Sequence, residues 1–481
     1  MSISNPPETA VDRPTLTPQA RRAVVVVLIG AILAFLDATV VNVALKSLAT
    51  DLGGTLDAIG WVVTVYLLVQ AAVLPVTGWA ARKVGPKRLY LGSLSLFTLA
   101  SVACAAAGTV GELVAARVAQ GLGAGVMIPV GQMILVTAAG RQGMARAMVA
   151  AGIPMVLTPV IGPTIGGLLL DYAGWQWIFL INAPIGALGL VLAVRLLPND
   201  VRDESAGALD VFGLTLVSAG MVGITYGLSE AASRGLADPR VLVSLCGGTA
   251  LVVLFVVHSL RTRNPVLDLR LWRDGFFATG TISTFVIGAV TFGAMVLLPL
   301  YFQIVRHQDA AHTGLLMAPQ GIGAALAMVV SARLYERIGT LTCLVGTLIG
   351  CAATVPFMLI TDDTPYWFLG CAMVFRGLGI GLAAMPAMTA ALRELTPSQI
   401  IDATPQLTVM QRVGGSIGTA TFVVVLQRHL PTSGDAAGAG SAFALTFTWV
   451  LAVSVLAVVP PLVMAGLERR GVKSRVRAGG R

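Results

Sequence analysis

The chain has 481 residues, of which 56% are hydrophobic and only 11% are charged. Soluble domains are roughly 25% charged, so the composition excludes an ordinary soluble protein and indicates a polytopic membrane protein. The formal net charge is +9. The basic residues are spread over many short loops and form no single stripe, which argues against a nucleic-acid-binding protein.

Apolar stretches of about 20 residues recur along nearly the whole chain, and each is long enough to cross a hydrocarbon core of roughly 30 Å. We predict fourteen spans. They begin near residues 22, 57, 88, 110, 144, 175, 209, 240, 276, 311, 340, 364, 402 and 440. Hydrocarbon offers no partner for backbone polar groups, so each span must be a helix and the fold class is all-α.

If the N-terminus lies in the cytoplasm, most of the 32 Lys and Arg residues fall in tails and loops on the cytoplasmic side of the membrane. This asymmetry predicts a multi-pass protein of the cytoplasmic membrane with both termini in the cytoplasm. The first stretch lacks a small-residue cleavage site and is interpreted as a retained span. The basic C-terminal tail is expected to lie against anionic membrane lipid.

A glycine run repeats along the chain. Residues 120–125 read Gln-Gly-Leu-Gly-Ala-Gly, and residues 376–381 read Arg-Gly-Leu-Gly-Ile-Gly. The repeat predicts two homologous bundles, as in parallel-repeat transporters. We expect a cytoplasmic tail, a six-helix bundle, two linking helices, a second six-helix bundle and a basic tail, with boundaries at 1–21, 22–197, 198–274, 275–468 and 469–481.

Two ionisable residues lie within apolar spans, Asp37 in the first and Arg117 in the fourth. Charges in hydrocarbon are costly and usually functional. Counted at 1.5 Å per residue, the two lie roughly 13 Å and roughly 10 Å from the outer ends of their spans, so they share a depth. A carboxyl group beside a guanidinium stays ionised, whereas one alone in an apolar site takes up a proton. We therefore hypothesise that Asp37 binds and releases a proton and that Arg117 modulates the protonation of Asp37. The alternative is a static ion pair between the two spans.

Four segments in order carry a family resemblance: residues 36–45, 117–125, 162–167 and 175–186. Together they resemble the major facilitator superfamily, in its fourteen-span drug:proton antiporter branch. The resemblance implies a two-bundle transporter in which Arg117 takes part in proton coupling. Residues 162–167 match the fifth-span antiporter motif, and we assign a gating role to Pro159, Gly162, Pro163, Gly166 and Gly167 because prolines bend a helix and glycines let helices approach closely. The alternative is that the glycines serve packing alone.

The loop at residues 78–88 resembles the gating loop of the same superfamily. The positions that carry the likeness are Gly78, Arg82, Gly85 and Lys87. Arg82 stands where the family pattern has an aspartate, so the family's usual charge contact between the two halves does not carry over directly.

Polar or aromatic residues set in apolar spans are candidates for lining a substrate cavity. They are Asn42, Tyr66, Gln70, Gln132, Tyr226, Tyr301, Gln303, Arg376, Gln411 and Arg412. No acidic residue lies well inside a span of the second half, so the two arginines favour a neutral, zwitterionic or singly charged lipophilic substrate over a dication. The alternative is that they brace helix ends through backbone carbonyls.

We find no Walker lysine, metal-ligand spacing or catalytic cluster, and the five cysteines are interpreted as packing residues. No cofactor, metal or enzymatic activity is expected, and energy must come from an ion gradient. The sequence thus predicts a monomeric proton-coupled antiporter that exports lipophilic small molecules such as drugs. The alternatives are a dedicated exporter of one metabolite, natural product or lipid, a non-transporting membrane sensor or receptor, and an embedded enzyme.

Overall fold

The computed structural model describes residues 17–200, 207–235, 238–308, 310–430 and 438–479. Within its helices, the side chains of Asn42 and of most residues between 141 and 164 lie outside the described part. The described residues form α-helices and three short 3₁₀ helices, with no β-strand among them. The all-helical fold class predicted from the sequence is confirmed.

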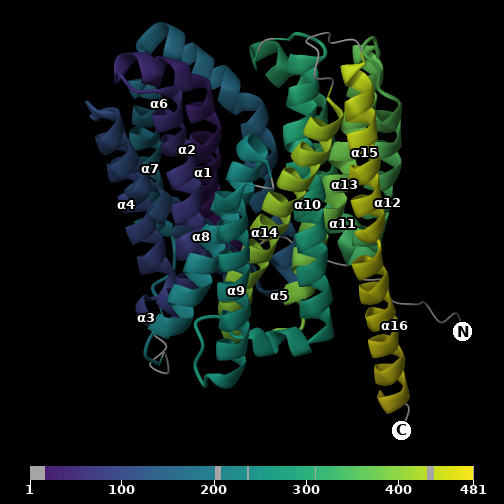
Figure 1. Ribbon diagram of the computed structural model, residues 1–481. Coiled ribbons are helices and arrows are strands. Elements are labelled where there is room, and N and C mark those ends of the chain that lie inside the picture. The colour runs from purple at the N-terminus through teal and green to yellow at the C-terminus, as the bar shows by residue number, and fades with distance from the viewer. Residues whose placement is uncertain (1–16, 201–206, 236–237, 309, 431–437, 480–481) are drawn as a thin grey trace, which may run out of the picture.

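The helices fall into three groups along the chain (Figure 1). The first comprises α1 (Pro18–Asp51), α2 (Leu56–Val73), α3 (Thr77–Val84), α4 (Pro86–Ala105), α5 (Val110–Ala173), α6 (Gln176–Leu180) and α7 (Asn182–Leu196). The middle pair is α8 (Val211–Arg234) and α9 (Pro239–Arg261). The last comprises α10 (Gly275–Ile304), α11 (Ala310–Ile338), α12 (Leu341–Thr354), α13 (Tyr366–Leu392), α14 (Pro397–His429), α15 (Ala439–Leu456) and α16 (Val459–Gly479).

Among the described residues, thirteen segments are long and apolar enough to cross a membrane. Helix α5 bends at Gly140, whose φ of 61° and ψ of −177° break the helical geometry. Residues 141–173, beyond this kink, occupy the place of the remaining predicted span. The count of fourteen spans therefore agrees with the structure, and glycine permits the kink because it tolerates a positive φ.

The helix starts follow from short polar residues at the ends of apolar runs. Thr109 caps α5 by accepting a hydrogen bond from the Glu112 amide at 3.2 Å, and Asp274 caps α10 in the same way from Phe277 at 2.8 Å. Thr396 begins α14 with a capping box to Gln399. Each cap satisfies a donor that the first turn of a helix leaves unpaired.

The two glycine runs perform the same packing task in the two halves. A Cβ added at Gly121 would lie 2.9 Å from the Tyr66 carbonyl of α2, and one at Gly123 would lie 2.8 Å from backbone atoms of α4. In the second half, Gly377 packs closely on α11, and a Cβ at Gly379 would lie 2.6 Å from Gly350 of α12. Small residues let helix backbones approach where lipid supplies no hydrophobic drive, so the sequence repeat corresponds to a repeated packing arrangement.

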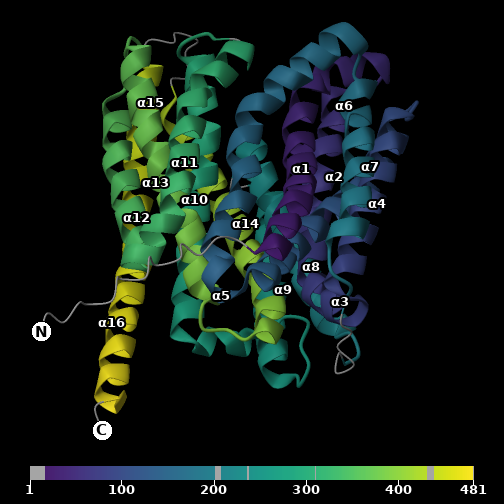
Figure 2. The ribbon, with the colours of Figure 1, turned by 180° about the vertical axis from the view of Figure 1, so that it is seen from behind.

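Two of the side-chain cores are formed largely within one half each. One core gathers residues of the first half, including Tyr90 and Phe97, and another gathers residues of the last, including Phe357 and Phe443. Helices α8 and α9 lie beside these halves in both ribbon views (Figures 1 and 2). Ser218 of α8 donates a 2.6 Å hydrogen bond to the Ala72 carbonyl of α2, which ties the middle pair to the first half.

Candidate functional site

Asp37 and Arg117 form a buried ion pair in the first half, which confirms that they share a depth. Arg117 Nη1 lies 2.5 Å from Asp37 Oδ2, and each residue is only 1% exposed. The Arg117 Nε–H donates to the Val62 carbonyl of α2 at 3.0 Å. The guanidinium therefore joins α1, α2 and α5 at one point.

Three further polar residues, none of which was predicted as a site residue from the sequence, complete the site. Gln120 of α5 donates to Asp37 Oδ1 at 2.8 Å and to Ser101 of α4 at 2.7 Å. Asn182, the first residue of α7, donates to Asp37 Oδ1 at 3.3 Å. Each is a polar residue at an apolar position, the same signal that identified the cavity candidates. The carboxylate thus accepts hydrogen bonds from three side chains on two helices, and its charge is fully satisfied in the ground state.

Aromatic rings enclose this ion pair. The Arg117 guanidinium carbon lies 4.0 Å from the centre of the Tyr66 ring and 5.9 Å from that of Phe179. Tyr66 is itself 1% exposed, and its hydroxyl donates to the Ala34 carbonyl at 3.3 Å. Asp37 is consequently shielded from solvent in this conformation.

A central cavity lies between the two halves. It consists of two adjoining chambers of about 230 Å³ and 280 Å³, and both are lined by α1, α10, α13 and α14. The first is walled mainly by apolar side chains, with four methionines: Met295, Met317, Met328 and Met385. Methionine adapts to irregular shapes, so this wall can change its shape.

Helix α1 carries both the ion pair and part of the cavity wall. Ala34, Phe35, Ala38 and Thr39 line the cavity, whereas Asp37 points into the first half against α5 and α7. At 100° per residue, Phe35 and Thr39 lie about 160° around α1 from Asp37, whereas Ala34 and Ala38 lie about 60° and about 100° from it. A shift of this helix would act on the cavity and the ion pair together.

The ten cavity candidates divide by location. Gln70, Gln132, Gln411 and Arg412 line the more polar chamber. Tyr66 lies in the wall of the ion-pair site, and the buried Tyr301 donates to the Thr361 carbonyl at 2.7 Å. Tyr226 stacks on Trp61, Gln303 is exposed, Arg376 lines a separate pocket, and the Asn42 side chain lies outside the described residues.

The two halves meet at the end of the molecule that carries α3. Arg82 of α3 forms an ion pair with Asp402 of α14, and a Cβ on Gly78 would lie 3.2 Å from the Ile401 carbonyl. Arg146 of α5 pairs with Glu336 of α11 at 2.9 Å. A charge contact between the halves is therefore present, with the basic residue on α3 and its acidic partner on α14.

A layer of apolar side chains accompanies these ion pairs. Met144 and Met148 of α5 pack in one cluster with Met388 and Leu392 of α13. We call this cluster and the two ion pairs the α3-end closure. Met388 of this cluster also lines the more polar chamber, so the α3-end closure borders the central cavity.

The remaining gating-loop residues anchor the turn between α3 and α4. Gly85 has a φ of 99°, a conformation that other residues rarely adopt. Asp200 accepts hydrogen bonds from the Lys87 amide at 2.7 Å and the Arg88 amide at 2.9 Å. The Lys87 ammonium donates to the Leu197 carbonyl at 2.7 Å. The loop is thus fixed to the segment that follows α7.

The glycines of the fifth-span motif pack the second part of α5 against α1. A Cβ on Gly162 would lie 2.9 Å from the Thr39 Cβ, and one on Gly166 would lie 2.9 Å from Val40 Cγ1. A Cβ on Gly167 would meet nothing within 4 Å. The side chains of Pro159 and Pro163 lie outside the described residues. Gly162 and Gly166 therefore bring α5 against α1 next to the Asp37 turn.

This contact predicts different effects for two neighbouring substitutions. Gly162→Ala should destabilise the protein by about 1–3 kcal/mol, because the added methyl group overpacks the α1 contact. Gly167→Ala should be neutral or raise stability by up to about 1 kcal/mol, since alanine is the better helix former. Apparent melting temperatures of the two purified variants measure the difference, and equal values would contradict the packing assignment.

Comparison with known proteins identifies the family to which this architecture belongs. The family model described as Major Facilitator Superfamily matches residues 27–419. The multidrug resistance protein B homolog of Mycobacterium tuberculosis strain H37Rv is 39% identical over 406 residues, which cover 83% of this chain and 75% of the relative.

Solved structures show the same fold at low sequence identity. The proton:xylose symporter XylE, bound to 6-bromo-6-deoxy-D-glucose, aligns with a TM-score of 0.61 and 16% identity over 92% of this chain and 94% of that chain. The human organic anion transporter MFSD10 aligns with a TM-score of 0.60 and 15% identity over 90% and 99%. The helical repeat, the central cavity and these matches together show that the chain belongs to the major facilitator superfamily.

Proposed function

We propose that the protein is a proton-coupled antiporter that exports lipophilic small molecules across the cytoplasmic membrane by alternating access. The observation that carries the proposal is the enclosed Asp37–Arg117 pair on the helix that also lines the central cavity. An ionisable pair inside a membrane protein is costly and marks an ion or proton pathway. The name of the M. tuberculosis relative, a multidrug resistance protein B homolog, supports export of drug-like molecules.

Asp37 is the proton carrier in this mechanism. While Arg117, Gln120 and Asn182 surround it, the carboxylate is ionised and satisfied. If α1 moves away from α5 and α7, the carboxyl group loses these donors in an apolar setting and takes up a proton. Arg117 then remains tied to Val62 and Tyr66. Proton uptake therefore accompanies a change in how α1 packs.

Alternating access requires the α3-end closure to open and close. The basic residues of α3 and the basic α16 lie at the same end of the molecule, the lower end in Figure 1. Positive residues favour the cytoplasmic side, so we assign this end, and both termini, to the cytoplasm. Substrate would enter the cavity when the closure is open and leave when it is formed. The cavity lies within one chain, which suits a monomer.

The cavity wall favours lipophilic molecules with at most one charge. Its first chamber is lined by apolar residues with Gln320 and Gln411, and the second adds the guanidinium of Arg412. A dication would face this positive charge without any acidic side chain among the lining residues. Neutral, zwitterionic or singly charged substrates meet a smaller electrostatic penalty.

Transport by reconstituted protein tests the proposal. Proteoliposomes with an imposed pH gradient should take up a lipophilic fluorescent monocation such as rhodamine 6G, and a protonophore should stop the uptake. Vesicles without protein serve as the control. Uptake at the same rate with and without the pH gradient would contradict proton coupling. Loss of one secreted compound on deletion of the gene, with no resistance on overexpression, would instead indicate a dedicated exporter.

A further inference from the structure

Arg376 of α13 is a buried guanidinium whose charge is not balanced by the residues around it. The side chain is 1% exposed, and its Nη2 donates to the Val290 carbonyl of α10 at 3.3 Å. Its Nε and Nη1 have no hydrogen-bond acceptor among the described residues. The ion pairs between described residues do not include Arg376, and the Phe447 ring, whose centre lies 5.9 Å from the guanidinium carbon, carries no charge. A buried charge without a partner is strongly unfavourable, so the site calls for an anion.

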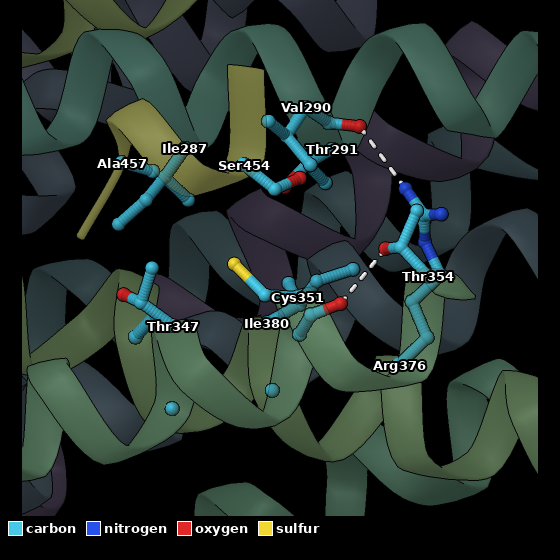
Figure 3. Close-up of a pocket in the computed structure, with 14 residues that line it drawn as sticks. Ile287, Val290, Thr291, Thr347, Cys351, Thr354, Arg376, Ile380, Ser454 and Ala457 are labelled. Carbon is cyan, nitrogen blue, oxygen red and sulfur yellow. Dashed lines mark hydrogen bonds between the residues drawn. The ribbon is translucent and has the colours of Figure 1, made fainter. Parts of the chain in front are cut away.

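The guanidinium lies at a pocket inside the second half. Four helices line it: α10, α12, α13 and α15. Figure 3 shows Arg376 beside Thr354, with Cys351, Ser454 and Thr291 around the same space. The pocket volume is about 40 Å³. This is room for about three or four water-sized particles, since one water needs roughly 10–15 Å³.

The glycine repeat relates this pocket to the Asp37 site. Arg376 begins the second glycine run at the position that Gln120 holds in the first. Gln120 donates to a carboxylate inside a cluster built from α1, α4, α5 and α7. The corresponding first, third, fourth and sixth spans of the second half are α10, α12, α13 and α15, which are the helices that line the Arg376 pocket. The first half supplies its own carboxylate, whereas the second half has a pocket.

We propose that this pocket binds a small monovalent inorganic anion, such as chloride, which takes the place in the second half that the Asp37 carboxylate takes in the first. The free N–H groups on Nε and Nη1 donate to the anion. Thr291 lies in the same pocket wall, where its hydroxyl group can turn toward the anion. Ser454 lines the pocket as well, with its hydroxyl donating to the Val450 carbonyl at 2.8 Å. The proposal does not depend on proton coupling or on drug export.

Size and depth define the anion class. Arg376 is ten residues from the start of α13, which puts it about 15 Å along the helix and near the middle of the membrane. A phospholipid headgroup remains at the interface and cannot reach this depth. The apolar wall, which includes Ile287 and Ile380, leaves no second cation to balance a divalent anion.

Thermal stability of the full-length protein in nanodiscs of fixed lipid composition tests the proposal. Replacing gluconate by chloride at constant ionic strength should raise the apparent melting temperature by about 2–4 °C in a saturable way. Arg376→Gln should abolish this rise and should be at least as stable as the parent in gluconate, because it removes the unbalanced charge. Arg412→Gln, which changes a guanidinium in the central cavity, should keep the rise.

Anomalous scattering from bromide locates the anion directly. A peak beside Arg376 is the expected result, and Arg376→Gln should lose it. A melting temperature that is the same in chloride and gluconate, or a peak beside Arg412 alone, would overturn the proposal. Equal destabilisation by Arg376→Gln in both salts would show a structural brace and would overturn it as well. Loss of proton-driven transport in other variants has no bearing on these measurements.

Discussion

The Asp37→Asn protein is expected to lose substrate-driven proton movement down to the level of empty vesicles. Asparagine keeps the size of the side chain and can still accept a hydrogen bond from Arg117, but it cannot bind and release a proton. It also leaves the Arg117 guanidinium without its counter-charge, at a stability cost of about 3–5 kcal/mol. Proteoliposomes loaded with the pH dye pyranine measure the proton flux when substrate is added.

Two further variants separate coupling from folding. Asp51→Asn changes an exposed carboxyl group at the end of the same helix and should leave the flux intact. Asp37→Glu keeps the titratable group and should retain part of it. Dye binding to purified Asp37→Asn protein shows whether the cavity persists. Normal proton flux in the Asp37→Asn protein would show that the ion pair is only a structural contact between α1 and α5.

Reversing one charge at the α3-end closure is expected to open it. In Asp402→Arg the new side chain repels Arg82, and the pair is only partly exposed, so repulsion is weakly screened. A change of about 1–2 kcal/mol would shift the ratio of closed to open molecules roughly 5–30-fold. Spin labels at positions 83 and 398, both exposed on the two sides of the contact, report the change as a longer distance in a background without the native cysteines.

The double variant Arg82→Asp/Asp402→Arg restores opposite charges and should recover most of the closed population, as a double-mutant cycle requires of a direct pair. Arg273→Asp reverses an exposed charge at the end of the short 3₁₀ helix before α10 and serves as the matched control. If the double variant stays as open as Asp402→Arg, the two residues do not act as a pair and Asp402 works through another contact.

Much of the architecture was predictable because it depends on local sequence. Apolar length sets the spans, since an unpaired backbone group in hydrocarbon is costly wherever it occurs. The glycine repeat indicated two related halves, and the packing of Gly121 and Gly377 agrees with it. Counting residues along two helices placed Asp37 and Arg117 at one depth, because helical rise is constant.

Contacts between helices could be identified only from the tertiary structure. The depth of a residue in the membrane does not determine the rotation of its helix or the helix that it contacts. Gln120 and Asn182 come from separate helices, and only packing brings them to Asp37. Asp402 lies far along the chain from Arg82, so the charge contact could not be read from the loop motif alone.

The sequence by itself determined an all-helical membrane protein with a duplicated core and a charged residue pair at one depth. Only the tertiary structure showed that Arg376 lines a separate pocket, whereas Arg412 lines the central cavity. Hydropathy is a property of each segment and fixes where the chain enters the membrane. The partner of a buried charge is set by helix rotation and close packing between distant segments.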